Sequence, residues 1–145
     1  MKRAALALLV SLLAACSPTP GSPATYEVRS VQNAVTEARA NLLTFFQAWN
    51  SENEAYSDFR VTVIMPSDAY GRDYVELTNI RQEFAGFIGE TPGGKTVPFL
   101  TADIADWRFK DGDKWRGGFT RRAMFDMTDA DIPNLRGQFH EEPLP

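Results

Sequence analysis

The candidate catalytic and metal-binding side chains of this 145-residue chain are mostly carboxylates. Two pairs are closely spaced, Asp103 with Asp106 and Asp111 with Asp113. A carboxylate pair can carry acid/base chemistry or hold a hard cation. The structural alternative, which we favour, is that Asp103 or Asp106 caps a turn and that the other pair is solvated at a loop tip. The same two interpretations apply to a looser acidic cluster at Asp126, Asp129 and Asp131.

Histidine and cysteine are too scarce for most other catalytic or metal sites. The chain has one histidine, His140, near its C-terminus, and one cysteine, Cys16. A hydrolase nucleophile needs a positioned base, and a histidine-based zinc or iron site needs several ligands. The glycine-rich segment 91–95 is followed by Val97 and Pro98, which favour an extended chain over the helix of a phosphate-binding loop. The sequence therefore predicts no catalytic residue, no metal and no cofactor.

The charge balance argues against a nucleic-acid partner. The formal net charge is −4 and the isoelectric point is about 5.0. Lys2 and Arg3 lie in an N-terminal leader, and without them 13 basic side chains stand against 19 acidic ones. No run of Lys or Arg could neutralise a phosphate backbone. With 43% hydrophobic residues, the chain can bury one modest core and is expected to form a single domain.

The N-terminus has the order of parts found in a secretory leader. Met1–Arg3 is positively charged, and Ala4–Ala15 is an apolar run too short to span a bilayer comfortably. The run ends in Leu-Ala-Ala-Cys at 13–16, which resembles the bacterial lipoprotein signal, in which the leader is cut just before the cysteine. The resemblance implies a signal peptide over 1–15, diacylglycerol on Cys16 and usually an acyl group on its new amine. The alternative is an ordinary secretory signal with an incidental cysteine.

The segment after the cysteine predicts a membrane tether. Several acyl tails anchor a protein stably, whereas one tail is marginal. Ser17–Pro23 is rich in Pro, Ser and Gly and reaches at most about 25 Å when extended. We therefore expect residues 16–25 to hold the domain close to the membrane. Ser17 stands where inner-membrane retention often has Asp, so we expect the outer membrane, facing the periplasm.

The elements that position the candidate side chains centre on Ala102–Phe125. Two runs rich in aromatic residues, Ile104–Phe109 and Trp115–Phe125, flank a polar tip at 110–114. The Asp-Gly pair in this tip indicates a tight β-hairpin, because Gly supplies the positive φ that such turns need.

The aromatic side chains of this hairpin could form a sheet core. In extended strands Trp107 and Phe109 share one face, and so do Trp115 and Phe119. If the two faces meet, the rings pack together, and the glycine pair at 117–118 leaves room for a bulge or close packing.

The rest of the chain predicts an α+β domain over 26–126. Apolar residues three and four apart predict one long N-terminal helix over Ser30–Trp49, packed on a mostly antiparallel sheet of about five strands. Residues 127–145 have few apolar side chains and several prolines, and they predict a flexible or loosely attached tail. The strands outside the hairpin are expected at Phe59–Met65, Tyr74–Ile80, Glu83–Gly89 and Val97–Leu100.

Short motifs in this domain resemble the YegJ-like family of bacterial domains of unknown function. The matching motifs are Ile-Ala-Asp-Trp at 104–107, Asp-Gly at 111–112 and Gly-Gly-Phe-Thr at 117–120, with weaker matches at 59–62 and 86–92. Many members carry an acidic residue, a His and a Trp on the second strand, and only the acidic residue has a counterpart here, Glu76. The resemblance covers roughly Val28–Phe125 and implies a secreted α+β domain. It implies no reaction, because the family has no established activity.

We predict a lipid-anchored binding or interaction module of the bacterial envelope. The expected partners are membrane lipid, through acylated Cys16, and an envelope protein. Burial of both hairpin tryptophans is favoured over exposure. Two alternatives stay open: an immunity-type protein that neutralises a periplasmic toxin, and an envelope enzyme that acts through Asp103 and Asp106. If the hairpin carries a recognition surface, its candidate residues are Asp106, Trp107, Trp115, Arg116, Arg121 and Arg122.

Overall fold

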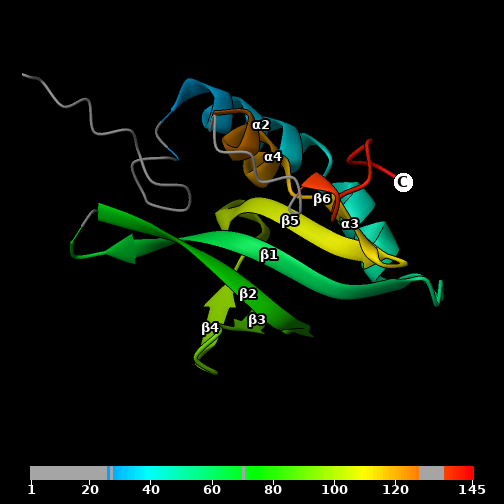
Figure 1. The fold of residues 1–145 in the computed structure, drawn as a ribbon. Helices are drawn as coiled ribbons and strands as arrows, with labels where there is room; N and C mark the ends of the chain where they lie inside the picture. The colour runs from blue at the N-terminus through cyan, green and yellow to red at the C-terminus, as the bar shows by residue number, and fades with distance from the viewer. Residues whose placement is uncertain (1–25, 27, 70, 128–135) are drawn as a thin grey trace, which may run out of the picture.

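The computed structural model describes residues 26, 28–69, 71–127 and 136–145. Within these residues, two helices in series cover one face of an antiparallel sheet of six strands, and a third helix follows the last strand (Figure 1). The predicted α+β class and antiparallel sheet are confirmed. The expected signal peptide, Cys16 and the tether lie outside the described residues.

The sheet has the strand order β4-β3-β2-β1-β5-β6, and every neighbouring pair is antiparallel. It has six strands where the sequence predicted about five. The hairpin around Asp111 and Gly112 is confirmed, since Asp111 of β5 pairs with Lys114 of β6. The strands are β1 Tyr56–Ser67, β2 Gly71–Glu83, β3 Gly86–Glu90, β4 Thr96–Phe99, β5 Ile104–Asp111 and β6 Lys114–Gly117.

The predicted single helix over Ser30–Trp49 is two helices, α2 Arg29–Ala40 and α3 Leu42–Trp49. Asn41 separates them with φ −105° and ψ 14°, and its side-chain Nδ2 donates to the Glu37 carbonyl at 2.9 Å. Asparagine competes for nearby backbone groups in this way and so favours helix ends. The apolar spacing continues across the break, which is why periodicity alone predicted one helix.

The face of the sheet beneath α2 and α3 holds the main hydrophobic core. Trp107 of β5 is 1% exposed, and its indole Nε1 donates to the Ala38 carbonyl of α2 at 2.8 Å. Its ring centroid lies 5.7 Å from that of Phe45 on α3. One side chain therefore ties both helices to the sheet. Other members of this core are Ala34, Ala48, Val61, Val63, Leu77, Ile80, Val97, Phe99, Ile104, Phe109 and Phe119.

Trp115 is also buried, but on the opposite face from Trp107 and Phe109. It stands directly opposite Lys110 in the β5–β6 pair. Residues directly opposite each other in antiparallel strands share a face, and alternate residues of one strand do not. The Trp115 ring therefore does not meet the Trp107 face, and the ring packing that such a meeting would allow does not form.

The second predicted run of the hairpin also ends earlier than expected. β6 ends at Gly117, and Phe119–Met127 forms helix α4. Gly117 and Gly118 have φ values of 73° and 68°, which turn the chain out of the strand. Phe119 still reaches the core, and its ring centroid lies 5.3 Å from that of Trp107.

Residues 136–145 are attached to β6, which corrects the predicted loose tail over this part of the chain. The Trp115 N–H donates to the Gln138 carbonyl at 2.8 Å, and the His140 N–H donates to the Trp115 carbonyl at 3.1 Å. Phe139 forms a parallel bridge with Trp115 and is 8% exposed. Backbone hydrogen bonds hold this segment, so its sparse apolar pattern did not reveal the attachment. The first residue of the predicted tail belongs to α4, and residues 128–135 lie outside the description.

Candidate functional site

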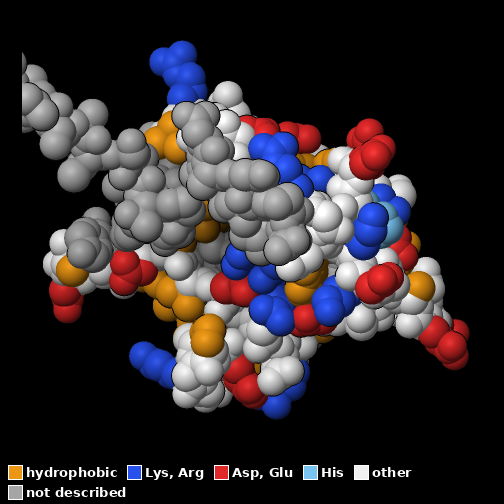
Figure 2. All heavy atoms as spheres, in the orientation of Figure 1, with side chains coloured by type: hydrophobic (Ala, Val, Ile, Leu, Met, Phe, Trp, Pro, Cys, Tyr) orange, Lys and Arg blue, Asp and Glu red, His pale blue; other side chains and the backbone are white. Residues whose placement is uncertain are grey.

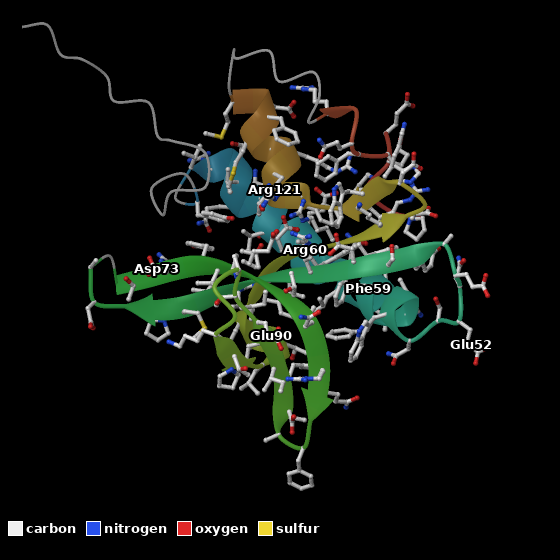
Figure 3. All side chains as sticks on the ribbon, turned by 60° about the horizontal axis from the view of Figure 1, so that its bottom comes forward. Glu52, Phe59, Arg60, Asp73, Glu90 and Arg121 are labelled. Carbon is white, nitrogen blue, oxygen red and sulfur yellow. The ribbon has the colours of Figure 1, made fainter. Side chains whose placement is uncertain are left out.

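One carboxylate, that of Glu76 on β2, is surrounded by three arginine side chains. Arg108 of β5 binds it through Nε at 3.1 Å and Nη2 at 2.9 Å. Arg60 of β1 donates from Nη1 at 3.1 Å, and Arg121 of α4 donates from Nη2 at 3.2 Å. Figure 3 shows Arg60 and Arg121 converging from the sheet and the helix. We call Arg60, Glu76, Arg108 and Arg121 the arginine cluster.

The sheet register brings the cluster together on the face that α2 and α3 leave uncovered. Arg60 stands directly opposite Arg108. Thr62, on the same face of β1, stands directly opposite Glu76. Like charges opposite each other destabilise a sheet, so the Glu76 carboxylate offsets the repulsion between the two guanidinium groups. Figure 2 shows basic and acidic side chains gathered in the middle of the face that it presents.

Arg121 reaches the cluster because Asp106 fixes the start of α4. The Asp106 carboxylate is 3% exposed and accepts hydrogen bonds from the backbone N–H groups of Phe119 at 3.1 Å and Thr120 at 2.9 Å. The Thr120 hydroxyl donates to it as well. A carboxylate at a helix N-terminus satisfies free N–H groups and interacts favourably with the helix dipole. Burial raises the pKa of Asp106, and the hydrogen bonds oppose that rise.

The indole of Trp115 supports the cluster from β6. The guanidinium carbon of Arg108 lies 4.1 Å from the ring centroid, and that of Arg60 lies 5.2 Å away. The Lys110 ammonium lies 5.4 Å from the same centroid. Cations are attracted to the face of an aromatic ring, most strongly to that of Trp. The ring therefore helps to order these cations.

The cluster and its neighbours carry more positive than negative charge. Arg60 also binds Asp58 through two nitrogens, at 2.8 and 2.9 Å. Asp106 also lies on this face, since Thr62 stands opposite both Glu76 and Asp106. Three carboxylates therefore stand against three guanidinium groups and the Lys110 ammonium. The Arg121 side chain is 45% exposed and uses one nitrogen for Glu76. A guanidinium has five N–H donors, so Arg121 keeps donors for an incoming carboxylate or phosphate.

Glu76 stays ionised despite partial burial. Burial raises its pKa, but the charges of Arg108 and Arg121 and hydrogen bonds from the cluster outweigh that effect, so the pKa of Glu76 lies below its ordinary value. A hydrogen bond from Arg60 likewise holds the pKa of Asp58 below its ordinary value. Neither group can act as a general acid at neutral pH. The cluster is suited to binding a negatively charged group rather than to proton transfer.

The candidate residues predicted on the hairpin do not form one surface. Trp107 belongs to the core, and Asp106 caps α4. Trp115 lies beneath the cluster and is 7% exposed. The favoured burial of both tryptophans is confirmed. Arg121 alone among these four contributes an exposed side chain to the arginine cluster.

Arg116 and Arg122, the other two candidates, bind the C-terminal segment instead. Arg116 Nη1 donates to the Leu144 carbonyl at 2.9 Å, and its Nε donates to Asp111 at 3.0 Å. Arg122 Nη1 donates to the His140 carbonyl at 2.9 Å. Asp111 is thus paired rather than simply solvated, which corrects that expectation. These two arginines hold the chain end in place.

The carboxylate pair proposed for catalysis has structural roles. Asp103 ends the short 3₁₀ turn Thr101–Asp103, and its Oδ2 accepts the Leu100 N–H at 2.8 Å. Asp106 is occupied at α4 as described above. The predicted cap of a turn is therefore confirmed for Asp103, whereas Asp106 caps the start of helix α4 rather than a turn. In the acidic cluster, Asp126 pairs with Arg136 at 2.9 Å, and its other two members lie outside the described residues.

Sequence reasoning missed Arg60 and Arg108 and noted Glu76 only through the family resemblance. The available signal was alternation: Arg60 and Glu76 lie on the polar faces of two adjacent predicted strands. Alternation does not specify the sheet register, and it is the register that places both residues beside Arg108.

Comparison of the chain with protein-family models, curated protein sequences and solved structures gave no match. The resemblance to the YegJ-like family therefore stays a prediction. Among the described residues, no three or more His, Cys, Asp or Glu side chains are grouped to hold a metal ion. No helix in the same residues is long and apolar enough to cross a membrane.

Proposed function

We propose that this protein is a lipid-anchored interaction module of a bacterial envelope and that it binds an acidic partner through the arginine cluster. The observation that carries the binding part is the convergence of three guanidinium groups on one carboxylate, with Arg121 half-exposed. The leader and Cys16 support the anchoring part. Arginine is the residue best suited to pairing with carboxylates at an interface, because its planar fork matches them.

The positive charge of the arginine cluster contrasts with the negative net charge of the whole protein. The mature chain is expected to be acidic, so a positively charged face would orient an approaching acidic partner. Complementary charge raises association rates and discriminates against wrong partners more than it raises affinity. We therefore expect binding that weakens as salt screens the charges.

A photo-crosslinking amino acid at Thr78 tests this proposal in living cells. Thr78 lies two residues after Glu76 on β2, next to the cluster. We expect the full-length, anchored protein to capture one envelope protein with an acidic surface. Adding Arg121→Glu should abolish the capture, because it reverses the exposed charge. Cys16→Ser should abolish palmitate incorporation and cleavage before residue 16.

Arg81→Glu is the matched control. Arg81 is also an exposed arginine, 59% accessible, and pairs with Glu90 at 3.8 Å outside the cluster. Capture should survive this change. Equal capture by the Arg121→Glu variant, or no capture by the parent protein, contradicts the binding part. A captured protein delivered by a neighbouring cell would identify the immunity-type alternative.

A further inference from the structure

The turn between β2 and β3 carries an aromatic residue that the fold does not require. Phe84 and Ala85 are the two residues between Glu83 and Gly86, which pair with each other. Phe84 is fully exposed, with a relative accessibility of 108%. Turns favour Gly, Asn, Asp, Ser and Pro for backbone reasons, none of which Phe supplies. Its exposure to water is unfavourable in the isolated domain.

Phe84 has apolar neighbours at the base of this turn. Leu100 is 53% exposed. A Cβ added to Gly86 would lie 2.8 Å from Leu100 Cδ2, so Leu100 packs directly over that glycine. Figure 3 shows the β2–β3 hairpin projecting from the rest of the sheet. An open groove of about 250 Å³ lies beside this turn, with Glu83 and Asp103 at its polar positions. The rest of its lining is mainly apolar and includes Ala85, Phe87, Ile88, Pro98, Phe99 and Leu100. We call Phe84, Leu100 and this groove the apolar tip.

We propose that the apolar tip inserts into the surface of the lipid bilayer to which Cys16 is attached. The proposal rests on the lipid anchor of the proposed function, not on the arginine cluster. An aromatic ring flanked by aliphatic side chains suits the boundary between headgroups and acyl chains. The anchor makes the encounter intramolecular, so even a weak contact is populated.

The length of the tether permits this contact. Residues 16–25 precede the described domain and span at most about 35 Å when extended. A compact domain of about 120 residues has a radius of gyration of about 14 Å, which corresponds to a diameter of about 35 Å. The extended tether is therefore about as long as the domain is wide. The domain can therefore turn on its tether until the tip meets the membrane.

The contact should be apolar rather than electrostatic. Glu83 lies next to Phe84 and is exposed, and Asp103 lines the groove as well. Their negative charges disfavour anionic headgroups, so neither anionic lipid nor low salt should strengthen the contact. This separates it from partner binding at the arginine cluster, which salt should weaken.

Tryptophan fluorescence of the reconstituted lipoprotein tests the proposal. Phe84→Trp and a matched control, Leu43→Trp, are purified from membranes and placed in vesicles of phosphatidylethanolamine and phosphatidylglycerol. Leu43 is also exposed, 68%, but lies on α3. We expect the emission added by Phe84→Trp to shift to shorter wavelength and to be quenched by lipids brominated on their acyl chains. The emission added by Leu43→Trp should show neither change.

These measurements test the membrane contact of the apolar tip separately from the acylation of Cys16. Absence of quenching for Phe84→Trp, or equal quenching for Leu43→Trp, overturns the membrane contact. If cells do not acylate Cys16, the anchor itself fails. The chain beginning at residue 16 can then be coupled through its single thiol to a maleimide-bearing lipid, and the same two variants still report on the tip.

Discussion

Glu76 shows how one residue can make an otherwise unfavourable arrangement stable. The sheet places Arg60 directly opposite Arg108. Without a carboxylate between them, the two guanidinium groups would repel each other and leave N–H donors unpaired. Glu76 accepts hydrogen bonds from both and from Arg121. The positive face therefore depends on a negative residue at its centre.

Replacement of Glu76 should reveal this dependence. We expect Glu76→Gln to lower the free energy of unfolding by about 1–3 kcal/mol at pH 7, less than for a fully buried ion pair because the carboxylate is partly exposed. Urea unfolding measures the change. Glu52→Gln, at an exposed position on the loop after α3, removes the same charge and should have little effect. Equal effects of the two substitutions would show that Glu76 has no special role.

The effect of Glu76→Gln should also depend on pH. The pKa of Glu76 in the folded protein lies below its ordinary value of 4.5. A group with a depressed folded pKa stabilises the protein above its unfolded pKa, and this contribution is lost as pH falls through the folded pKa. The stability difference between parent and variant should therefore be full at pH 7 and shrink at pH values below 4.5. A constant difference across this range would contradict the assignment.

At the scale of elements, the β5–β6 hairpin and α4 are joined by a turn that only glycine fits. Gly117 has φ 73°, and a Cβ there would lie 2.3 Å from the Trp107 carbonyl oxygen and 2.6 Å from its ring. The turn places α4 so that Asp106 can cap it and Arg121 can reach Glu76. The arginine cluster therefore depends on the geometry of this junction.

Two glycine substitutions separate backbone strain from steric conflict. Gly112 at the hairpin tip has φ 65° and nothing within 4 Å of an added Cβ. We expect Gly112→Ala to cost about 1–2 kcal/mol for its left-handed backbone alone. Gly117→Ala should cost about 3 kcal/mol or more, because backbone and indole must also move. Denaturant unfolding of both variants measures the difference, and similar costs would contradict the steric account.

At the scale of the whole molecule, the C-terminal segment closes one edge of the sheet. Residues 136–145 bond to β6, while α2 and α3 cover one face and the arginine cluster occupies the other. An uncovered edge strand presents unpaired backbone groups to other chains. The segment therefore protects β6 and keeps Trp115 beneath the cations.

Truncation after residue 135 should expose this edge. We expect the free energy of unfolding to fall by about 2–4 kcal/mol, from lost hydrogen bonds and the lost burial of Phe139. Iodide should then quench Trp115 more strongly than in the full chain. Phe139→Ala, which keeps the backbone bonds, should give a smaller loss of stability and less quenching. Unchanged stability and quenching after truncation would mean that the segment contributes nothing.

Features that depend on neighbouring residues were predictable from the sequence. Alternation of apolar and polar side chains predicted the strands around Val61 and Val63, and the Asp-Gly pair predicted the turn at Gly112. The α+β class and the antiparallel sheet follow from such local patterns. Capping by Asp103 was predictable for the same reason, because its partner lies three residues away.

Features that depend on strand register and on contacts between distant segments became clear only from the folded chain. The face on which Trp115 lies changes with a shift of one residue in pairing, which sequence periodicity does not specify. The break at Asn41 lies within an apolar pattern that continues unchanged across it. The arginine cluster joins residues from β1, β2, β5 and α4, and it forms because the strand register and the cap at Asp106 act together.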